Sequence, residues 1–141
     1  MATTTFLSNA DISITQGVTT TDMSDQANAC SVTIGQDSLE STAFGDSGHI
    51  FTGGLQTVEV SITFFLSYGA AEVEAILNSC VGTGTTGLTI APNGSGPSAS
   101  SPSYVLENCM LASFTPINST VGELATVEAS FTGGTWVREI A

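Results

Sequence analysis

Residues 57–63 read TVEVSIT, and residues 126–132 read TVEASFT. Both stretches alternate polar and apolar residues with a period of two, a pattern typical of a half-buried β-strand. Successive side chains of a strand point to opposite faces of its sheet, so each stretch predicts one polar and one apolar face. The polar faces share a Thr-Glu-Ser-Thr row, formed by Thr57, Glu59, Ser61 and Thr63 and again by Thr126, Glu128, Ser130 and Thr132.

The charge balance of the 141-residue chain is unusual: 13 acidic residues, one basic residue (Arg138), no lysine and a net charge of −12. Charged residues make up only 10% of the chain, against about 25% in typical domains, so the anomaly lies in missing bases. Because lysine and arginine supply the affinity for phosphates, this chain is not expected to bind nucleic acid. Any self-association must rest on apolar contacts and backbone pairing.

The cysteines and the N-terminus bear on the cellular compartment. The three cysteines, Cys30, Cys80 and Cys109, lack CxxC spacing and lie in apolar settings, which favours buried thiols in a reduced compartment over one disulfide plus a free thiol. The start MATTTFLSNADIS has no basic residue and no apolar run typical of export. No stretch approaches the roughly 20 apolar residues that span a membrane.

The rest of the chain predicts a mainly β fold. YGAAEVEAILNSCVG is the single helix candidate, over about 70–81, because Val73, Ile76, Leu77 and Cys80 form one apolar stripe. The fold class is therefore an antiparallel β-sandwich or barrel of six to seven strands with one short flanking α-helix. The strands are expected at 6–15, 30–34 with a continuation over 37–44 after a bend at Gly35, 55–66, 86–91, 103–116 and 124–133, and residues 135–141 finish the chain.

Polar and glycine-rich segments are expected to be loops. Residues 16–28 are rich in threonine, and residues 45–54, GDSGHIFTGG, hold four glycines and predict a long mobile loop. The segment NGSGPSASSPS, residues 93–103, is a further flexible loop by composition. The alternation within 103–116 breaks near Asn108, which indicates a β-bulge.

Three motifs suggest chemistry that their context does not support. GTGTTG at 82–87 matches a dinucleotide-binding pattern, but a helix precedes it and a strand follows, the reverse of the required order. GDSGH at 45–49 resembles a serine protease nucleophile segment, yet His49 is the sole histidine and follows Ser47 by two residues. Glu59 and Glu128 are better explained as solvated strand residues than as an acid–base pair. We predict no catalytic residue, no cofactor and no metal ion.

The order of several segments resembles the major tail tube proteins of long-tailed bacteriophages. The segments are ESTAFGDSGHIFTGGLQTVEVSITFF, AAEVEAILNSC, LTIAPNGSG and SFTPINSTVGELATVEASFTGGTW, within residues 30–137. In that family a Thr-Phe-Gly-Asp type segment leads through a glycine loop into a long alternating strand. A Ser-Val-Gly-Asp type turn, here residues 119–123, then feeds the last long strand and a glycine pair.

The resemblance implies a single β-sandwich domain over residues 1–141 that assembles into rings, usually hexameric, stacked into a tube through which the genome passes. Its implied partners are other copies of itself, a tape measure protein, a tail terminator and tail-tip proteins. DNA would pass without specific binding, and no membrane would be involved. The protein would be made in the host bacterial cytoplasm and reside in the tail of the virion.

The residue pattern fits this assembly. If strands 55–66 and 124–133 are neighbours, the two polar rows form one face that would line the bore, where carboxylates repel DNA phosphates over about 8 Å at physiological salt. The loop 45–54 is expected to contact the next ring, through Phe44, Asp46, His49, Ile50 and Phe51. Residues 1–29 would supply a strand and an arm reaching a neighbouring subunit, or be disordered.

Two other functions fit the composition less well. A phage head decoration protein, or another minor virion protein, would form small knobs without a bore. An extracellular ligand-binding β-sandwich would need exposed aromatic side chains along a groove, whereas the chain has one tryptophan and two tyrosines.

Overall fold

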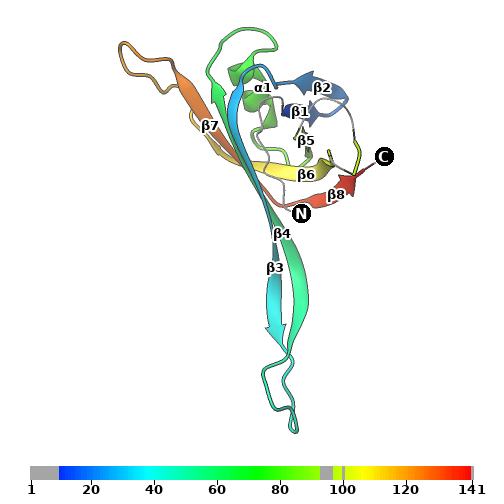
Figure 1. The fold of residues 1–141 in the computed structure, drawn as a ribbon. Helices are drawn as coiled ribbons and strands as arrows, with labels where there is room; N and C mark the ends of the chain where they lie inside the picture. The colour runs from blue at the N-terminus through cyan, green and yellow to red at the C-terminus, as the bar shows by residue number, and fades with distance from the viewer. Residues whose placement is uncertain (1–9, 93–96, 100, 141) are drawn as a thin grey trace, which may run out of the picture.

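Figure 1 shows the fold as a computed structural model, which describes residues 10–92, 97–99 and 101–140. The first nine residues of the predicted N-terminal arm, and residues 93–96 and 100 of the predicted Gly/Ser/Pro loop, lie outside the described residues. The described residues form eight strands and one helix: β1 (Asp11–Gln16), β2 (Thr19–Asp22), β3 (Ala27–Glu40), β4 (Phe51–Phe65), α1 (Val73–Cys80), β5 (Thr86–Ala91), β6 (Ser103–Phe114), β7 (Thr126–Thr132) and β8 (Thr135–Glu139).

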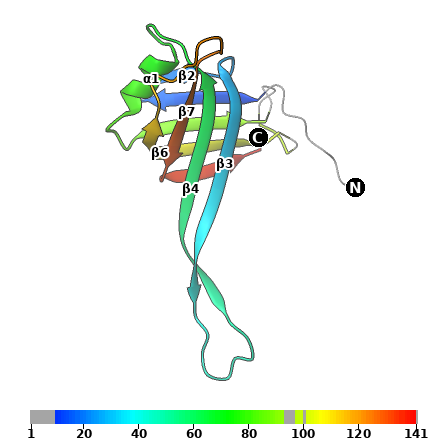
Figure 2. The same cartoon turned by 90° about the vertical axis from the view of Figure 1, so that its left-hand side faces the viewer.

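The mainly β, antiparallel fold with one helix is confirmed, although eight strands form instead of six or seven. Hydrogen-bonded neighbours follow the order β2-β1-β5-β6-β7-β4-β3, and β8 pairs with β6 outside this path. The path is not closed, because β2 and β3 are its two ends. Figure 2 shows its two layers: β3, β4 and β7 cross over β1, β5 and β8.

Strand β6 belongs to both layers. Its first half pairs with β5 and β8, and its second half, from Met110, pairs with β7. The core lies between the layers and is filled by the apolar rows of the strands and the inner side of α1. Its largest fully buried side chains are Phe64, Phe131, Ile14, Met23, Ile62, Leu77, Leu88, Leu106, Val58, Val60, Val73 and Val127.

A glycine corner lets β6, β7 and β8 turn together from one layer to the other. Asn108 has a positive φ of 58°, and the β5–β6 register shifts beside it, which confirms the predicted bulge. Opposite this bulge, Gly133 and Gly134 join β7 to β8 with φ of 83° and 87°. A Cβ atom on Gly134 would overlap the carbonyl oxygen of Glu107. Glycine is therefore required there for space as well as for conformation.

Helix α1 is shorter than the predicted 70–81. Ala71 has a positive φ of 63°, so the chain cannot be helical there. The Ser67 hydroxyl accepts a hydrogen bond from the Val73 backbone N–H at 3.3 Å and donates to the Glu72 carboxylate at 2.9 Å. These contacts set the start of the helix at Val73. Its inner side buries Val73, Leu77 and Cys80, as the apolar stripe predicts.

The loop predicted at 16–28 is wrong in part, because residues 19–22 form β2. This strand contains three threonines and an aspartate, and most of its side chains are exposed. Its sequence therefore has no apolar row that would indicate a strand. It forms because a turn at Gly17, with φ of 65°, folds it back onto β1. Its register pairs Thr15 with Thr20, whose hydroxyls lie 2.9 Å apart.

Candidate functional site: a polar sheet face and a hairpin arm

The two Thr-Glu-Ser-Thr rows lie side by side, as predicted. Strands β4 and β7 are antiparallel neighbours whose register places Ser61 opposite Ser130. The same register places Glu59 opposite Thr132 and Thr63 opposite Glu128. We call the eight residues of these rows the polar face: Thr57, Glu59, Ser61, Thr63, Thr126, Glu128, Ser130 and Thr132.

The polar face is open, while the residues between its members are buried. Glu59 and Glu128 are exposed, and the serines and threonines are exposed or half-buried. Between them, Val58, Val60, Ile62, Val127, Ala129 and Phe131 are buried in the core. The alternation therefore predicted the orientation of both strands correctly.

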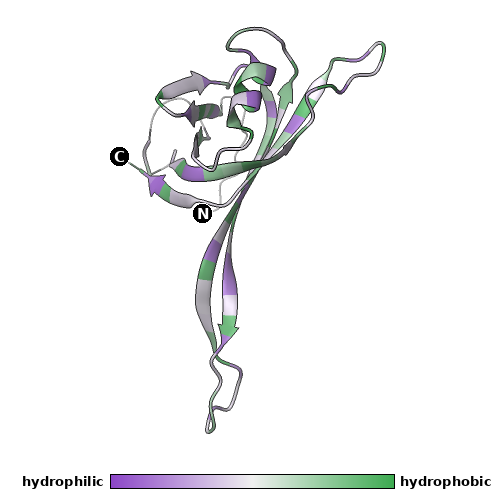
Figure 3. Cartoon of the chain, turned by 180° about the vertical axis from the view of Figure 1, so that it is seen from behind, coloured by the Kyte–Doolittle hydropathy of each residue, from purple (hydrophilic) through white to green (hydrophobic). Residues whose placement is uncertain are grey.

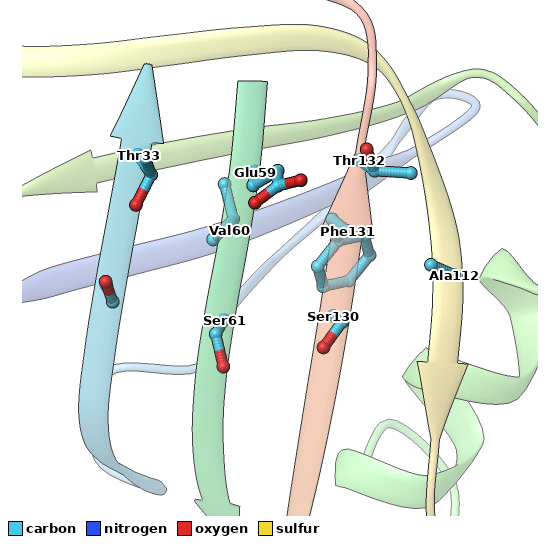
Figure 4. A pocket seen from close by; sticks show the side chains of 9 residues that line it. Thr33, Glu59, Val60, Ser61, Ala112, Ser130, Phe131 and Thr132 are labelled. Carbon is cyan, nitrogen blue, oxygen red and sulfur yellow. The ribbon is translucent and has the colours of Figure 1, made fainter. Parts of the chain in front are cut away.

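Two further hydroxyls extend this face onto β3. Ser31 pairs with Ser61, and Thr33 pairs with Glu59. Together with Ala112 of β6, they line a pocket of about 440 Å³ on this side of the sheet, and Figure 4 shows Thr33, Glu59 and Thr132 side by side across three strands. The alternation of CSVTI already separated Ser31 and Thr33 from the apolar row of that strand, but only the β3–β4 pairing brings them to this face.

The chemistry of this face is that of a hydrogen-bonding, negatively charged surface. The Ser61 hydroxyl donates to the Glu128 carboxylate at 3.2 Å, and the polar face contains no base. The sole arginine, Arg138, lies exposed on β8, in the other layer. Without bases the face cannot attract phosphates. Its carboxylates can repel a polyanion, and its hydroxyls can hold water at the surface.

Among the described residues, no group of three or more His, Cys, Asp or Glu side chains could hold a metal ion. No helix within this part of the chain is long and apolar enough to cross a membrane.

Strands β3 and β4 continue beyond the rest of their sheet as a hairpin. The last β4–β7 pair is Glu59 with Thr132, so the earlier residues of β4 pair with β3 alone. Figures 1 and 2 show this hairpin projecting away from the two layers. We call residues 36–56 the arm. The predicted loop 45–54 extends too far towards its C-terminal end, because β4 begins at Phe51 and residues Phe51, Thr52 and Gly53 pair with β3.

Hydrogen bonds connect residues at the tip of the arm. Asp46 accepts a hydrogen bond from the Ala43 N–H at 2.7 Å, and the Ile50 N–H donates to the Thr42 hydroxyl at 2.9 Å. The His49 ring nitrogen Nδ1 lies 2.5 Å from a Glu40 carboxylate oxygen. His49 therefore faces a carboxylate on the opposite strand.

The arm exposes large apolar side chains. Phe44, Ile50 and Phe51, which the sequence predicts at a contact, are all exposed, and so are Leu39 and Leu55. Exposed apolar groups of this size on a projecting hairpin are typical of a contact surface.

The cysteines are all free thiols. Cys80 and Cys109 are buried, as predicted, whereas Cys30 is exposed on the edge strand β3. The Cys30 thiol nevertheless lies in an apolar groove with Val32, Ile90 and Tyr104. Loss of water in this groove raises its pKa to about 11.

No family model matches this sequence, and no curated protein sequence matches it. Solved structures do match. The SPP1 tail tube superposes with a TM-score of 0.72 at 8% identity, covering 98% of this chain and 80% of that chain. The sheath–tube complex of the extracellular contractile injection system PVC gives a TM-score of 0.68 at 15% identity, covering 98% and 93%.

The tail of an empty gene transfer agent (GTA) particle, refined with C6 symmetry, gives a TM-score of 0.67 at 10% identity, covering 93% of this chain and 94% of that chain. The likeness therefore extends over 93–98% of this chain and 80–94% of the other chains, with strongly diverged sequences. The chain has the fold of the tail tube proteins of phages and phage-like particles.

Proposed function

We propose that this chain is the structural subunit of a phage tail tube. In this proposal copies of the chain form rings, six to a ring, and the rings stack into a tube in the tail of the virion. The polar face lines the bore, and DNA passes along it during genome ejection. The observation that carries the proposal is the continuous polar face on a chain whose fold matches tail tubes over nearly its full length.

The polar face would act by keeping DNA off the wall. Each copy contributes the carboxylates of Glu59 and Glu128 to the bore, together with a row of hydroxyls that hold water. Repulsion between carboxylates and phosphates reaches about 8 Å at physiological salt, so the duplex meets a hydrated wall without binding sites. Such a wall lets DNA slide past without being held at particular base sequences.

The open sheet supports ring formation. Among the described residues, strand β3 ends the path of paired strands and so has one unpaired edge next to the polar face. A free edge attracts another strand, and pairing with a neighbouring copy would extend the sheet around a ring and remove the edge. Ion pairs can add little to this contact, because the chain has a single arginine and no lysine.

The arm would reach the ring above or below. Its projection beyond the sheet and its exposed apolar side chains support this role. A terminator and a tip protein would then close the ends of the tube, and a tape measure protein would occupy its bore before DNA enters.

The ligand-binding alternative is not favoured. Trp136, the single tryptophan, is half-buried, and its indole N–H donates to Gln56 at 3.0 Å. Its ring lies 6.2 Å from that of Tyr104, so it serves as a packing residue.

The test is to place positive charge on the polar face. The variant Glu59→Lys with Glu128→Lys should still form tubes, but its lysines should retain DNA in the bore and lower the fraction of particles that deliver their genome. The matched control is Glu107→Lys with Glu139→Lys, which makes the same charge change at exposed residues of β6 and β8. Equal genome delivery by the two variants would contradict the proposal.

A further inference from the structure

An apolar groove opens between the two layers beside Cys30. Its walls come from three strands: Cys30 and Val32 of β3, Ile90 of β5 and Tyr104 of β6. Its volume is about 240 Å³, and none of the described residues that line it is charged. Figure 3 shows hydrophobic residues along the strands where the two layers cross. Because Ile90 belongs to the core and Val32 packs against it, the groove continues the apolar core to the surface.

The described part of the chain begins at the wall of this groove. Ala10, the first described residue, is half-buried and lines the groove together with Cys30. The ladder between β1 and β5 ends at the pair of Asp11 with Ala91. The next residue along from Ala91 is Pro92, which has no N–H to extend the ladder. The residues before Ala10 are therefore joined to the chain at the groove itself.

The sequence before Ala10 suits an apolar groove. Residues 1–9, MATTTFLSN, contain no charged side chain and one aromatic residue, Phe6. Phe6 precedes Ala10 by four positions, a span of at most about 14 Å in an extended chain. A tether this short holds Phe6 near the groove at an effective concentration of roughly millimolar or more. The chain's own Phe6 therefore has an advantage over the same residue of another copy.

The chemistry of the walls favours an aromatic ring. The ring of Tyr104 can meet a second ring, and such pairs are more stable than their buried area alone would make them. The sulfur of Cys30 also makes favourable contacts with aromatic rings. Leu7, the neighbour of Phe6, would point to the opposite side of an extended segment.

We propose that Phe6 docks in the groove of its own chain, against Cys30 and Tyr104, and closes this side of the core. The inference goes beyond the proposed tube function and does not depend on it, because the contact forms within a single chain. An arm that reaches a neighbouring subunit would instead place Phe6 in the groove of another copy.

Alkylation of Cys30 by iodoacetamide tests the proposal, because a docked ring covers the thiol. On the unassembled chain in dilute solution, Phe6→Ala should raise the rate at Cys30 by about tenfold, the loss expected when a buried phenylalanine side chain no longer holds the docked state. Phe44→Ala is the matched control. It makes the same substitution at a fully exposed phenylalanine of the arm and should react like the wild type.

A second variant locates the contact in this groove. Val32→Thr keeps the shape of a half-buried wall residue but makes it polar, and thermal unfolding checks that the fold is kept. In the wild type this change should raise the rate at Cys30, because it weakens docking. In the Phe6→Ala background it should change the rate by less than about twofold, because little docking is left to lose.

Three outcomes would overturn the inference. One is an unchanged rate at Cys30 in Phe6→Ala, and another is an effect of Val32→Thr that is the same in both backgrounds. The third is a difference between wild type and Phe6→Ala that disappears on dilution, which would assign the groove to Phe6 of another copy. All three leave the proposed tube function standing, because the measurements concern the single chain.

Discussion

The Ser61 hydroxyl donates a hydrogen bond to the Glu128 carboxylate across β4 and β7, at 3.2 Å, although the two residues are 67 positions apart in the sequence. The bond reflects how the two TVE segments meet. They run antiparallel about the Ser61–Ser130 pair, so each glutamate lies opposite a threonine of the other segment. Like charges directly opposite each other would be destabilising, and this register avoids them.

This register predicts the effect of one added carboxylate. Thr63→Glu places a carboxylate directly opposite Glu128, which should lower the free energy of unfolding by roughly 0.2–1 kcal/mol, and salt should reduce the loss. Thr57→Glu is the control, because Thr57 pairs with Gly35 on β3. Urea unfolding of the single chain at low and high salt measures both. Equal losses for the two variants would contradict the register.

The glycine corner predicts unequal costs for two adjacent alanines. Gly133→Ala should lower the free energy of unfolding by about 1–2 kcal/mol, because its φ is positive but a Cβ there meets open space. Gly134→Ala should cost more, because its Cβ would overlap the Glu107 carbonyl. Chemical denaturation checks the order, and a Gly133→Ala loss equal to or above that of Gly134→Ala would show that the corner is built differently.

Replacing phenylalanine by alanine should affect the free energy of unfolding differently in the core and in the arm. Phe131→Ala removes a fully buried ring between the layers, and it should lower the free energy of unfolding by about 3–5 kcal/mol. Phe51→Ala, on the exposed arm, should change it by no more than about 0.5 kcal/mol while weakening ring stacking. Denaturation followed by imaging separates the two effects. A large loss of stability from Phe51→Ala would mean that the arm is part of the core.

The Cys30 thiol predicts an unusual pH dependence of alkylation. The thiolate is the reactive form, and loss of water around the thiol in the apolar groove raises the pKa of Cys30 to about 11. Its rate of reaction with iodoacetamide should therefore be low at neutral pH. The rate should still rise about tenfold per pH unit at pH values where the rate of an ordinary thiol has already levelled off. Peptide mass spectrometry at a series of pH values gives the rate for Cys30 alone. A plateau near pH 9 would contradict the desolvation of this thiol.

The elements that the sequence predicts well are those with a buried face. Strand β7, the second half of β4 and strand β5 bury every second side chain, and the period of two shows this directly. The polar face followed from the same period, because an exposed row must alternate with a buried one. The extension of the polar face onto β3 depends on which strands pair, and the residue pattern of one strand does not give its partners.

The parts that the sequence predicts poorly have no buried face of their own. Strand β2 is polar on both sides and exists because it pairs with β1. The sequence predicts residues 51–54 of the arm in a loop because Gly53 and Gly54 lie there, yet both glycines belong to β4, whose pairing continues to the Phe51–Glu40 pair. In both places, backbone hydrogen bonding to a neighbouring strand overrides residue preference.

A cryo-EM reconstruction of tubes formed by the purified chain would show whether the polar face borders the bore of the assembled tube. We expect the carboxylates of Glu59 and Glu128 from every copy to lie along the wall of the bore. A reconstruction in which these two side chains lie on the outer wall, or are buried between neighbouring copies, would contradict this expectation.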